Sequence, residues 1–251
     1  MILGVIPARY GSSRFPGKPL ARVNGTPLIQ LVWERAKAAK RLERLLVATD
    51  DPRIGEVVRR FGGEAVMTPK DLPSGTDRVW QAAQGTPARI VVNIQGDEPL
   101  ITPGMVDRLV EGLEREPKAQ MATLRYAMKG VEGQEDPNVV KVVADADRWA
   151  LYFSRSPIPH FRGARINPGT ATRKSGSVVW YKHLGLYGYR REALQQFVGW
   201  PSSALEQAEG LEQLRALERG MRIKVLDSPH NTVGVDTPDD LKRVEEMLSR
   251  A

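Results

Sequence analysis

The sequence predicts an α/β fold, in which the strands of one sheet alternate with helices that cross over between them. A continuous apolar run typical of a buried parallel strand occurs at residues 2–6, and strand-like runs follow at 45–49 and at 89–94, the last rich in β-branched residues. A helix-like segment follows each run and begins with a capping residue and a proline, at Thr26-Pro27, Asp51-Pro52 and Thr102-Pro103. This alternation is the pattern of a sheet with crossover helices.

The elements can be placed in order along the chain. The first helix is expected to extend to about Lys40, and the second to stop at Gly62 and Gly63, which tolerate a positive φ. A further strand is expected at 121–127. The C-terminal part reads as a long helix over 204–219, a strand at 223–226 and a final helix opened by Thr237-Pro238.

The pattern changes between residues 137 and 189. Strand-like segments at 139–144, 150–154 and 183–189 are interrupted by a stretch rich in glycine, arginine and proline, 156–176, without helical periodicity. We interpret residues 1–251 as a single domain that carries an insertion over about 137–189, with a mobile loop.

Composition excludes several classes of protein. The chain has 251 residues, 41% hydrophobic and 27% charged, so it can bury a core, and its lack of cysteine excludes disulfides, thiolate zinc sites and cysteine nucleophiles. No apolar run approaches the ~18 residues of a membrane span, and the N-terminus lacks the features of a signal peptide. We therefore expect a cytoplasmic protein without a membrane partner.

The net charge favours anionic partners. Lysine and arginine exceed aspartate and glutamate by 37 to 30, a formal charge of +7. The basic residues are spread along the chain, aromatic residues make up only 6%, and no nucleic-acid-binding motif is present. Phosphorylated metabolites or acidic sugars are therefore expected as partners, and nucleic acid is not.

A basic loop follows the first strand, over residues 7–20 (PARYGSSRFPGKPL). It combines Gly11 and Gly17 with the cations Arg9, Arg14 and Lys18, at the end of the sheet where α/β proteins bind phosphates. The alternative is a solvated surface loop. The segment matches neither the dinucleotide fingerprint nor the P-loop, which argues against a dehydrogenase and an ATPase.

Two acidic segments also follow apolar runs, and we expect both at strand ends. Asp97 lies in NIQGDEP after the strand at 89–94, and Asp236 lies in GVDTP. Two such carboxylates could hold one Mg²⁺, which takes oxygen ligands and leaves positions for substrate phosphates. The alternative is a pair of capping aspartates, which Asp236 resembles because Thr237-Pro238 follows it.

Other polar residues have less specific patterns. The segment Ser74 to Arg78 (SGTDR) could place donors around a base or phosphate at the start of a helix, or could be a plain capping turn. The three histidines show no zinc spacing, which disfavours a zinc hydrolase. His183 sits in an apolar strand, as core histidines often do.

Taken together, these segments resemble the 3-deoxy-manno-octulosonate cytidylyltransferases, or CMP-Kdo synthetases. The resemblance covers nearly the whole chain and rests on IPARYGSSRFPGKPL, ATDD, SGTDR, VNIQGDEP, NVVKVV, ALYFSR, KHLGLYGYR, LEQLR and GVDTPDDL. It implies a Rossmann-like nucleotidyltransferase fold with a mixed sheet and a homodimer built partly from a β-rich insertion. It also implies transfer of CMP from CTP to the anomeric hydroxyl of 3-deoxy-D-manno-octulosonate (Kdo) for lipopolysaccharide synthesis.

The resemblance also implies roles for individual residues. The expected catalytic residues are Lys18, Asp97 and Asp236, with the two aspartates as ligands of an Mg²⁺ cofactor. The expected nucleotide-binding residues are Pro7, Ala8, Arg9, Gly11, Ser12, Ser13, Arg14, Lys18, Ser74, Arg78, Gln95, Gly96 and Asp97. The expected sugar-binding residues are Arg155, His183, Tyr187, Glu206 and Gln213.

Two departures from the family pattern lie near the expected sugar pocket. The stretch 157–162 (PIPHFR) lacks a tryptophan that many relatives carry, and 206–209 reads EQAE where EHIE is more usual. A cytidylyltransferase for another acidic sugar, such as sialic acid, is therefore the alternative within enzymes. The basic loop, however, lacks the K-G and terminal K-N pairs of sialic-acid relatives. A non-catalytic nucleotide-binding regulator is the alternative outside enzymes.

Overall fold

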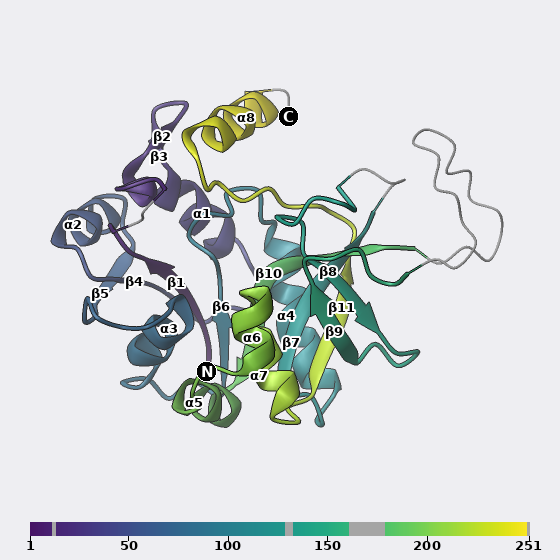
Figure 1. Cartoon of the computed structure of the whole chain (residues 1–251). Coiled ribbons are helices and arrows are strands. Elements are labelled where there is room, and N and C mark those ends of the chain that lie inside the picture. The colour runs from purple at the N-terminus through teal and green to yellow at the C-terminus, as the bar shows by residue number, and fades with distance from the viewer. Residues whose placement is uncertain (12–13, 129–132, 161–178, 250–251) are drawn as a thin grey trace.

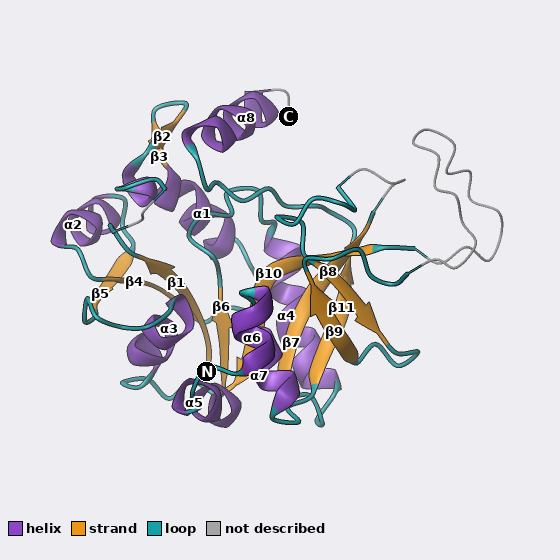
Figure 2. Ribbon diagram, viewed as in Figure 1, coloured by secondary structure: helices purple, strands orange, loops and turns teal. Residues whose placement is uncertain are grey.

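The computed structural model describes residues 1–11, 14–128, 133–160 and 179–249, and within them it shows a sheet flanked by helices (Figures 1 and 2). The strands are β1 (Ile2–Ala8), β2 (Arg22–Val23), β3 (Thr26–Pro27), β4 (Arg44–Thr49), β5 (Glu64–Met67), β6 (Ile90–Asn93), β7 (Met121–Ala127), β8 (Lys141–Ala144), β9 (Ala150–Ser154), β10 (Tyr181–Arg190) and β11 (Ile223–Ser228). The helices are α1 (Leu28–Lys37), α2 (Pro52–Arg60), α3 (Gly75–Ala83), α4 (Pro103–Arg115), α5 (Arg191–Gly199), α6 (Ala204–Glu209), α7 (Gln213–Glu218) and α8 (Pro238–Ser249), with a short 3₁₀ helix, η1 (Lys18–Leu20).

The central sheet has the order β11-β7-β10-β6-β1-β4-β5. Its N-terminal half is parallel, because β1 pairs in parallel with β4 and β6, and β4 pairs in parallel with β5. The carboxyl ends of β1, β4 and β6 therefore meet at one edge, and the loops that follow these strands lie together there. The predicted α/β fold is confirmed, and the basic loop and the Asp97 segment both start at this edge.

Both faces of the sheet are covered, which explains the continuous apolar runs. Ile2 and Ile6 of β1 pack into one core with α1, α2 and α4, whereas Leu3 and Val5 pack into a second core with α3, α5 and α7. A strand buried on both faces has no solvent side and so shows no polar alternation.

The sheet is mixed because β10 runs antiparallel to both of its neighbours, β6 and β7. Residues 181–189 of the expected insertion therefore form a central strand of the sheet. Strands β8 and β9 extend outward from β10 as the β-rich part of the segment. Most of the stretch 156–176 lies outside the described residues.

Two local predictions were wrong. The expected long helix over 204–219 is broken into α6 and α7, because the chain turns at Gly210, which has a φ of 62°. Thr26 does not cap α1: it lies in β3, which pairs with β2 in a small hairpin, because the residue before a proline favours extended backbone. The pattern also gave no sign of the short strand β5 or of α5.

The C-terminal helix α8 closes a small separate core. Val235 and Val244 pack there against Val23 and Leu28, so that α8 lies beside the β2–β3 hairpin (Figure 1). In the described part of the chain, the helices are too short or too polar to cross a membrane.

Candidate active site

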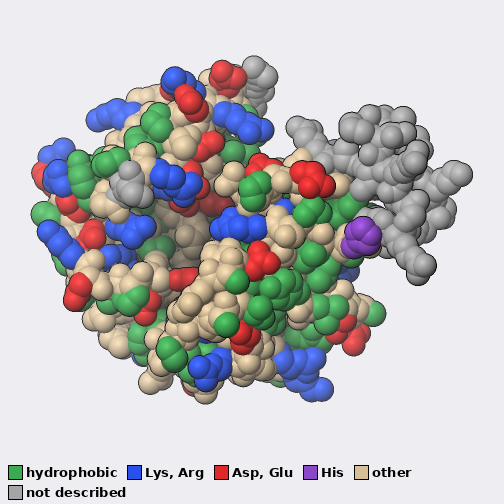
Figure 3. Space-filling model, viewed as in Figure 1, with side chains coloured by type: hydrophobic (Ala, Val, Ile, Leu, Met, Phe, Trp, Pro, Cys, Tyr) green, Lys and Arg blue, Asp and Glu red, His purple; other side chains and the backbone are tan. Residues whose placement is uncertain are grey.

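A cavity of about 450 Å³ opens at the carboxyl ends of β1 and β6. Figure 3 shows a hollow near the centre of the displayed face, with lysine, arginine and acidic side chains around it. The wall consists of residues from five separate segments: Pro7, Ala8, Arg9, Arg14, Lys18, Pro19, Leu72, Pro73, Ser74, Gly75, Arg78, Gln95, Gly96, Asp97, Glu212 and Asp236. Most of the residues expected to bind nucleotide or to take part in catalysis are among them.

The basic loop is folded back by a glycine turn. Gly17 has a φ of 71° and donates its N–H to the carbonyl oxygen of Tyr10 at 2.9 Å, which closes the loop. A side chain at this position would be strained and would press against the Tyr10 ring. The helix η1 begins directly after this turn, and its first residue, Lys18, lines the cavity.

The Asp97 segment depends on a close approach of two backbones. A Cβ atom added to Gly96 would lie 2.8 Å from the carbonyl oxygen of Pro7, so only glycine fits beside β1. This contact holds Gln95 and Asp97 at the cavity wall. The neighbouring Glu98 does not line the cavity, and burial raises the pKa of its carboxyl group.

Asp236 reaches the same place by a different route from the expected one. It does not follow a strand: it lies on the irregular segment 229–237 that joins β11 to α8. Val235, the residue before it, donates its N–H to the carbonyl oxygen of Asp97 at 2.8 Å. That hydrogen bond ties the two acidic segments together.

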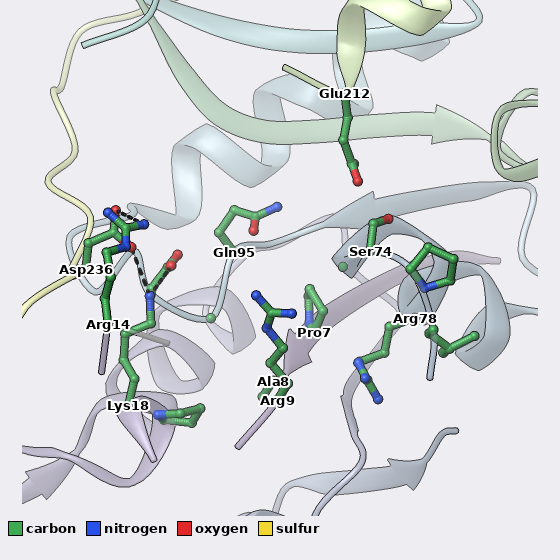
Figure 4. A pocket seen from close by; sticks show the side chains of 16 residues that line it. Pro7, Ala8, Arg9, Arg14, Lys18, Ser74, Arg78, Gln95, Glu212 and Asp236 are labelled. Carbon is green, nitrogen blue, oxygen red and sulfur yellow. Dashed lines mark hydrogen bonds and ion pairs between the residues drawn. The ribbon is translucent and has the colours of Figure 1, made fainter. Parts of the chain in front are cut away.

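The three expected catalytic side chains form one ion cluster. The Nζ atom of Lys18 lies 2.6 Å from Oδ2 of Asp97 and 3.3 Å from Oδ1 of Asp236. Arg14 pairs with the other oxygen of Asp236 at 3.2 Å. Figure 4 shows Lys18, Arg14 and Asp236 at one end of the cavity.

These carboxylates fit a cation that protein and substrate hold jointly. Oxygens of Asp97 and Asp236 already converge on one positive atom, the Lys18 ammonium. Among the described residues, no group of three or more acidic or histidine side chains could hold a metal. Two hard oxygen ligands of this kind would leave the remaining positions of an Mg²⁺ octahedron for phosphates and water.

The opposite end of the cavity carries two polar side chains, Ser74 and Arg78, that hydrogen bonds within the protein hold in place. Arg78 is 3% exposed; its guanidinium donates to the carbonyl oxygen of Pro69 at 3.2 Å and pairs with Asp50 at 3.3 Å. Ser74 caps α3, since its Oγ accepts from the N–H groups of Thr76 and Asp77. The capping role of Ser74 that the sequence left open is therefore real, and the residue also lines the cavity.

Glu212 is a cavity residue that the sequence interpretation missed. It enters from the turn between α6 and α7, and its Oε2 accepts a hydrogen bond from the Thr76 hydroxyl at 2.7 Å. Figure 4 shows its carboxylate approaching from the side opposite Pro7 and Ala8. The signal was present in the motif LEQLR, from which only the adjacent Gln213 had been selected.

The remaining nucleotide-binding predictions have mixed outcomes. Gly11 is described but does not lie on the cavity wall. Ser12 and Ser13 fall outside the described residues.

The five expected sugar-binding residues do not line this cavity. The Arg155 guanidinium donates to the carbonyl oxygens of Glu209 at 2.7 Å and Pro137 at 2.8 Å. Glu206 takes part in a capping box with Ser203, and it also pairs with an arginine of α7. Gln213 is buried at the start of α7, next to Glu212 in the chain.

His183 and Tyr187 both lie on β10, and their rings are 5.4 Å apart. Burial raises the pKa of Tyr187, and Tyr189 and the charge of Glu212 add to this effect. Tyr187 is thus near enough to Glu212 to be affected by its charge, and Gln213 follows Glu212 in the chain.

His183 is held as a neutral imidazole. The Thr123 hydroxyl lies 2.9 Å from both its Nε2 and the carbonyl oxygen of Leu186. Because the hydroxyl has one proton to give to a carbonyl, Nε2–H of His183 must be the donor to Thr123. Burial lowers the pKa of His183 to about 3, and the charge of Lys182 acts in the same direction.

We expect this buried histidine to make stability depend on pH. Between the ordinary pKa of 6.5 and about 3, the unfolded state binds a proton that the folded state does not. The free energy of unfolding should therefore fall as the pH drops through this window, by up to about 1.4 kcal/mol per pH unit. Urea titrations across the window would measure the slope of the unfolding free energy against pH. His183→Gln should reduce this slope by the amount that corresponds to about one proton. An unchanged slope would show that His183 titrates normally.

Comparisons with known proteins identify the family of this chain. A family model described as cytidylyltransferase matches residues 3–223. A 3-deoxy-manno-octulosonate cytidylyltransferase of Geobacter sulfurreducens is 49% identical over 247 residues, which covers 98% of this chain and 99% of that protein. The chain belongs to the 3-deoxy-manno-octulosonate cytidylyltransferase family.

Two further matches describe the family resemblance. A 3-deoxy-manno-octulosonate cytidylyltransferase of Syntrophobacter fumaroxidans is 50% identical over 253 residues, covering 99% of this chain and 97% of that one. A solved CMP:2-keto-3-deoxy-manno-octonic acid synthetase in complex with CTP superposes with a TM-score of 0.90 at 43% identity, covering 99% and 98% of the two chains. The family resemblance seen in the sequence is thus confirmed over the full length of the chain.

Proposed function

We propose that this protein transfers CMP from CTP to the anomeric hydroxyl of Kdo, giving CMP-Kdo and pyrophosphate. The observation that carries the proposal is the cavity in which Lys18, Asp97 and Asp236 meet within 3.3 Å. A relative solved in complex with CTP and full-length relatives named 3-deoxy-manno-octulosonate cytidylyltransferase support it.

The cavity has two unlike ends, which suggests how CTP would lie. Arg14 and Lys18 stand at one end, where their charges suit the triphosphate, with Arg9 between the ends (Figure 4). Ser74 and Arg78 stand at the other end, where these fixed polar side chains would face the ribose and the cytosine. Gln95 and Gly96 would lie between them, beside the α-phosphate and ribose.

The transfer would proceed by in-line attack. The anomeric hydroxyl of Kdo gives up its proton to solvent and its oxygen bonds to the α-phosphorus; the bond from that phosphorus to the β-phosphate oxygen breaks, and pyrophosphate leaves with the electron pair. Both substrates are anions, so the main tasks of the protein are positioning and charge neutralisation. Arg14 and Lys18 would offset the charge of the phosphates.

We propose that Asp97 and Asp236 hold the Mg²⁺ that this chemistry requires. Bound there, the ion would act as a Lewis acid on the phosphate oxygens. In the structure the Lys18 ammonium lies between the same two carboxylates. A bound triphosphate would offer Lys18 another anionic partner and so would release the carboxylates.

The sugar would enter on the Glu212 side of the cavity. The charge of Glu212 acts on Tyr187, whose ring lies 5.4 Å from that of His183, and Gln213 follows Glu212 in the chain. Arg155 and Glu206 are the other two residues that we propose for sugar binding. Because His183 is neutral, it would act there as a hydrogen-bonding or packing group and not as a counter-ion for the sugar carboxylate. The homodimer, the cytoplasmic location and a role in lipopolysaccharide synthesis are part of the same proposal.

Pyrophosphate release is the direct test. The protein would be incubated with CTP and Mg²⁺ and with Kdo, with a sialic acid or with no sugar. We expect release with Kdo, and much less with the other two. Preferential release with the sialic acid would favour the alternative acidic-sugar cytidylyltransferase, and CTP binding without any release would favour a nucleotide-binding regulator.

A further inference from the structure

The turn that carries Asp236 into α8 contains a second aspartate with an unusual set of contacts. Oδ2 of Asp240 accepts hydrogen bonds from the N–H of Asp236 at 3.1 Å, the N–H of Thr237 at 2.9 Å and the Thr237 hydroxyl at 2.8 Å. In return, the N–H of Asp240 donates to the Thr237 hydroxyl at 3.2 Å. Asp240 itself does not line the cavity.

Part of this arrangement is ordinary helix capping. Thr237 stands at the N-cap of α8, and Asp240 occupies the position from which an acidic side chain reaches back to the cap. Capping alone requires contact with Thr237 only. The additional hydrogen bond from the N–H of Asp236 extends the contact to the residue whose carboxylate faces Lys18 and Arg14.

Asp236 needs such support because its segment has no regular structure. Residues 229–237 belong to neither a helix nor a strand. The backbone is held on the one side by the N–H of Val235, bonded to Asp97 at 2.8 Å, and on the other by Asp240. Side chains cannot hold a site geometry more firmly than their own backbone is held, so both anchors bear on where the Asp236 carboxylate lies.

We propose that Asp240 is a positioning residue for the reaction: its carboxylate fixes the backbone of Asp236 and so sets where that carboxylate lies relative to Asp97 and Lys18. This inference rests on the proposed function, because it takes Asp236 to be the ligand of the ion that works with CTP. Asp240 then acts through Asp236 and touches neither substrate nor ion.

The chain offers a matched control in the neighbouring residue. Asp239 lies in the same first turn of α8, carries the same charge and is 92% exposed at its side chain, where it pairs only with Lys242 among the described residues. Asp239→Ala removes the same unit charge near the helix start without touching Asp236. Asp240→Asn is the conservative variant, because an amide oxygen can accept the same hydrogen bonds.

The experiment measures Mn²⁺ affinity by electron paramagnetic resonance in the presence of a CTP analogue with a methylene bridge between the α- and β-phosphorus, which cannot turn over. Asp240→Ala should weaken Mn²⁺ binding and raise the Mg²⁺ concentration for half-maximal turnover, each roughly tenfold, since a misplacement of about 1 Å can cost up to 10²-fold. Asp240→Asn should restore most of the affinity, and Asp239→Ala should match the unaltered protein.

A purely structural role of Asp240 would give a different result. In that case Asp240→Ala would lower the melting temperature, while the Mn²⁺ affinity and the Mg²⁺ requirement would stay unchanged, and the proposal would be overturned. Equal effects of Asp239→Ala and Asp240→Ala would also overturn it, because they would point to charge alone.

A second variant covers the case in which Asp240→Ala does not fold. Thr237→Ala removes the hydroxyl that holds the Asp240 carboxylate, and it should weaken Mn²⁺ binding in the same direction but less. An unchanged affinity would count against the proposal. If the unaltered protein releases no pyrophosphate with any sugar, the proposed function fails by itself, whereas the Mn²⁺ titrations still decide the role of Asp240.

Discussion

Asp97→Asn and Asp236→Asn should each lower turnover with CTP and Kdo by about 10² or more, the effect of losing one charge contact in the transition state. A carboxylate oxygen of each side chain contacts the Lys18 ammonium, so both side chains face the same point. The amide keeps the size of the side chain but removes its negative charge, which weakens the hold on Mg²⁺. Steady-state rates at saturating Mg²⁺ and CTP would measure the loss.

The matched control for both variants is Asp239→Asn, on the exposed side of α8. It removes one negative charge from the protein without reaching the cavity and should leave turnover unchanged. Melting temperatures of Asp97→Asn and Asp236→Asn should stay close to that of the unaltered protein, because both carboxylates are partly exposed. Near-normal turnover of both variants at saturating Mg²⁺ would remove the metal hypothesis.

The parallel half of the fold was predictable from the sequence because its signals are local. A strand buried on both faces needs a continuous apolar run, and a helix that begins after it needs a cap, as Asp51 provides for α2. Parallel strands end at one edge of the sheet, so the basic loop and Asp97 could be placed together without knowledge of the rest of the chain.

Other features depend on contacts between distant segments, which a local pattern does not carry. Nothing in the sequence of β10 shows that it lies between β6 and β7. A strand of the central sheet and a strand of a separate insertion can have the same local sequence pattern. Asp236 was expected at a strand end, but its position comes from the hydrogen bond of Val235 to Asp97. Glu212 reaches the cavity only because Gly210 breaks the helix before it.

The residues expected to bind the sugar show most clearly that a motif alone does not place a side chain in the cavity. The family resemblance named Arg155, Glu206 and Gln213, but the structure keeps them in contacts within the protein or away from the cavity wall. Motif residues carry information about packing as well as about ligands, and the sequence does not separate the two. Their part in sugar binding stays a prediction.

Lys18→Met should have opposite effects on turnover and on metal binding. Turnover should fall by about 10², because the ammonium no longer offsets the charge of the phosphates. Binding of Mn²⁺ to the protein without nucleotide should become at least about tenfold tighter, since two unit charges about 4 Å apart repel by roughly 1 to 4 kcal/mol and Mn²⁺ carries two such charges. Paramagnetic resonance titrations without nucleotide would measure the second effect.

Arg14→Met tests whether Lys18 acts by occupying the site between the two carboxylates or only by its positive charge. Arg14 carries the same charge as Lys18 and pairs with Asp236, but among the described residues it does not bridge the two carboxylates, and its side chain is 63% exposed. The substitution Arg14→Met should therefore tighten Mn²⁺ binding much less than Lys18→Met does. If the unaltered, nucleotide-free protein binds Mn²⁺ as tightly as Lys18→Met does, the ammonium does not compete with the metal.

Competition at Lys18 would also couple the two ligands of the protein. On the proposed binding mode, CTP would draw the ammonium away from the carboxylates and a bound metal would oppose its return, so each ligand should favour the other. Binding free energies are linked reciprocally, so the factor by which CTP tightens Mn²⁺ must equal the factor by which Mn²⁺ tightens CTP. Direct contact between metal and triphosphate would also contribute, and this part should persist in Lys18→Met. The difference in coupling between the two proteins would then measure the exchange of partners by Lys18, and equal coupling in both would show that Lys18 makes no such exchange.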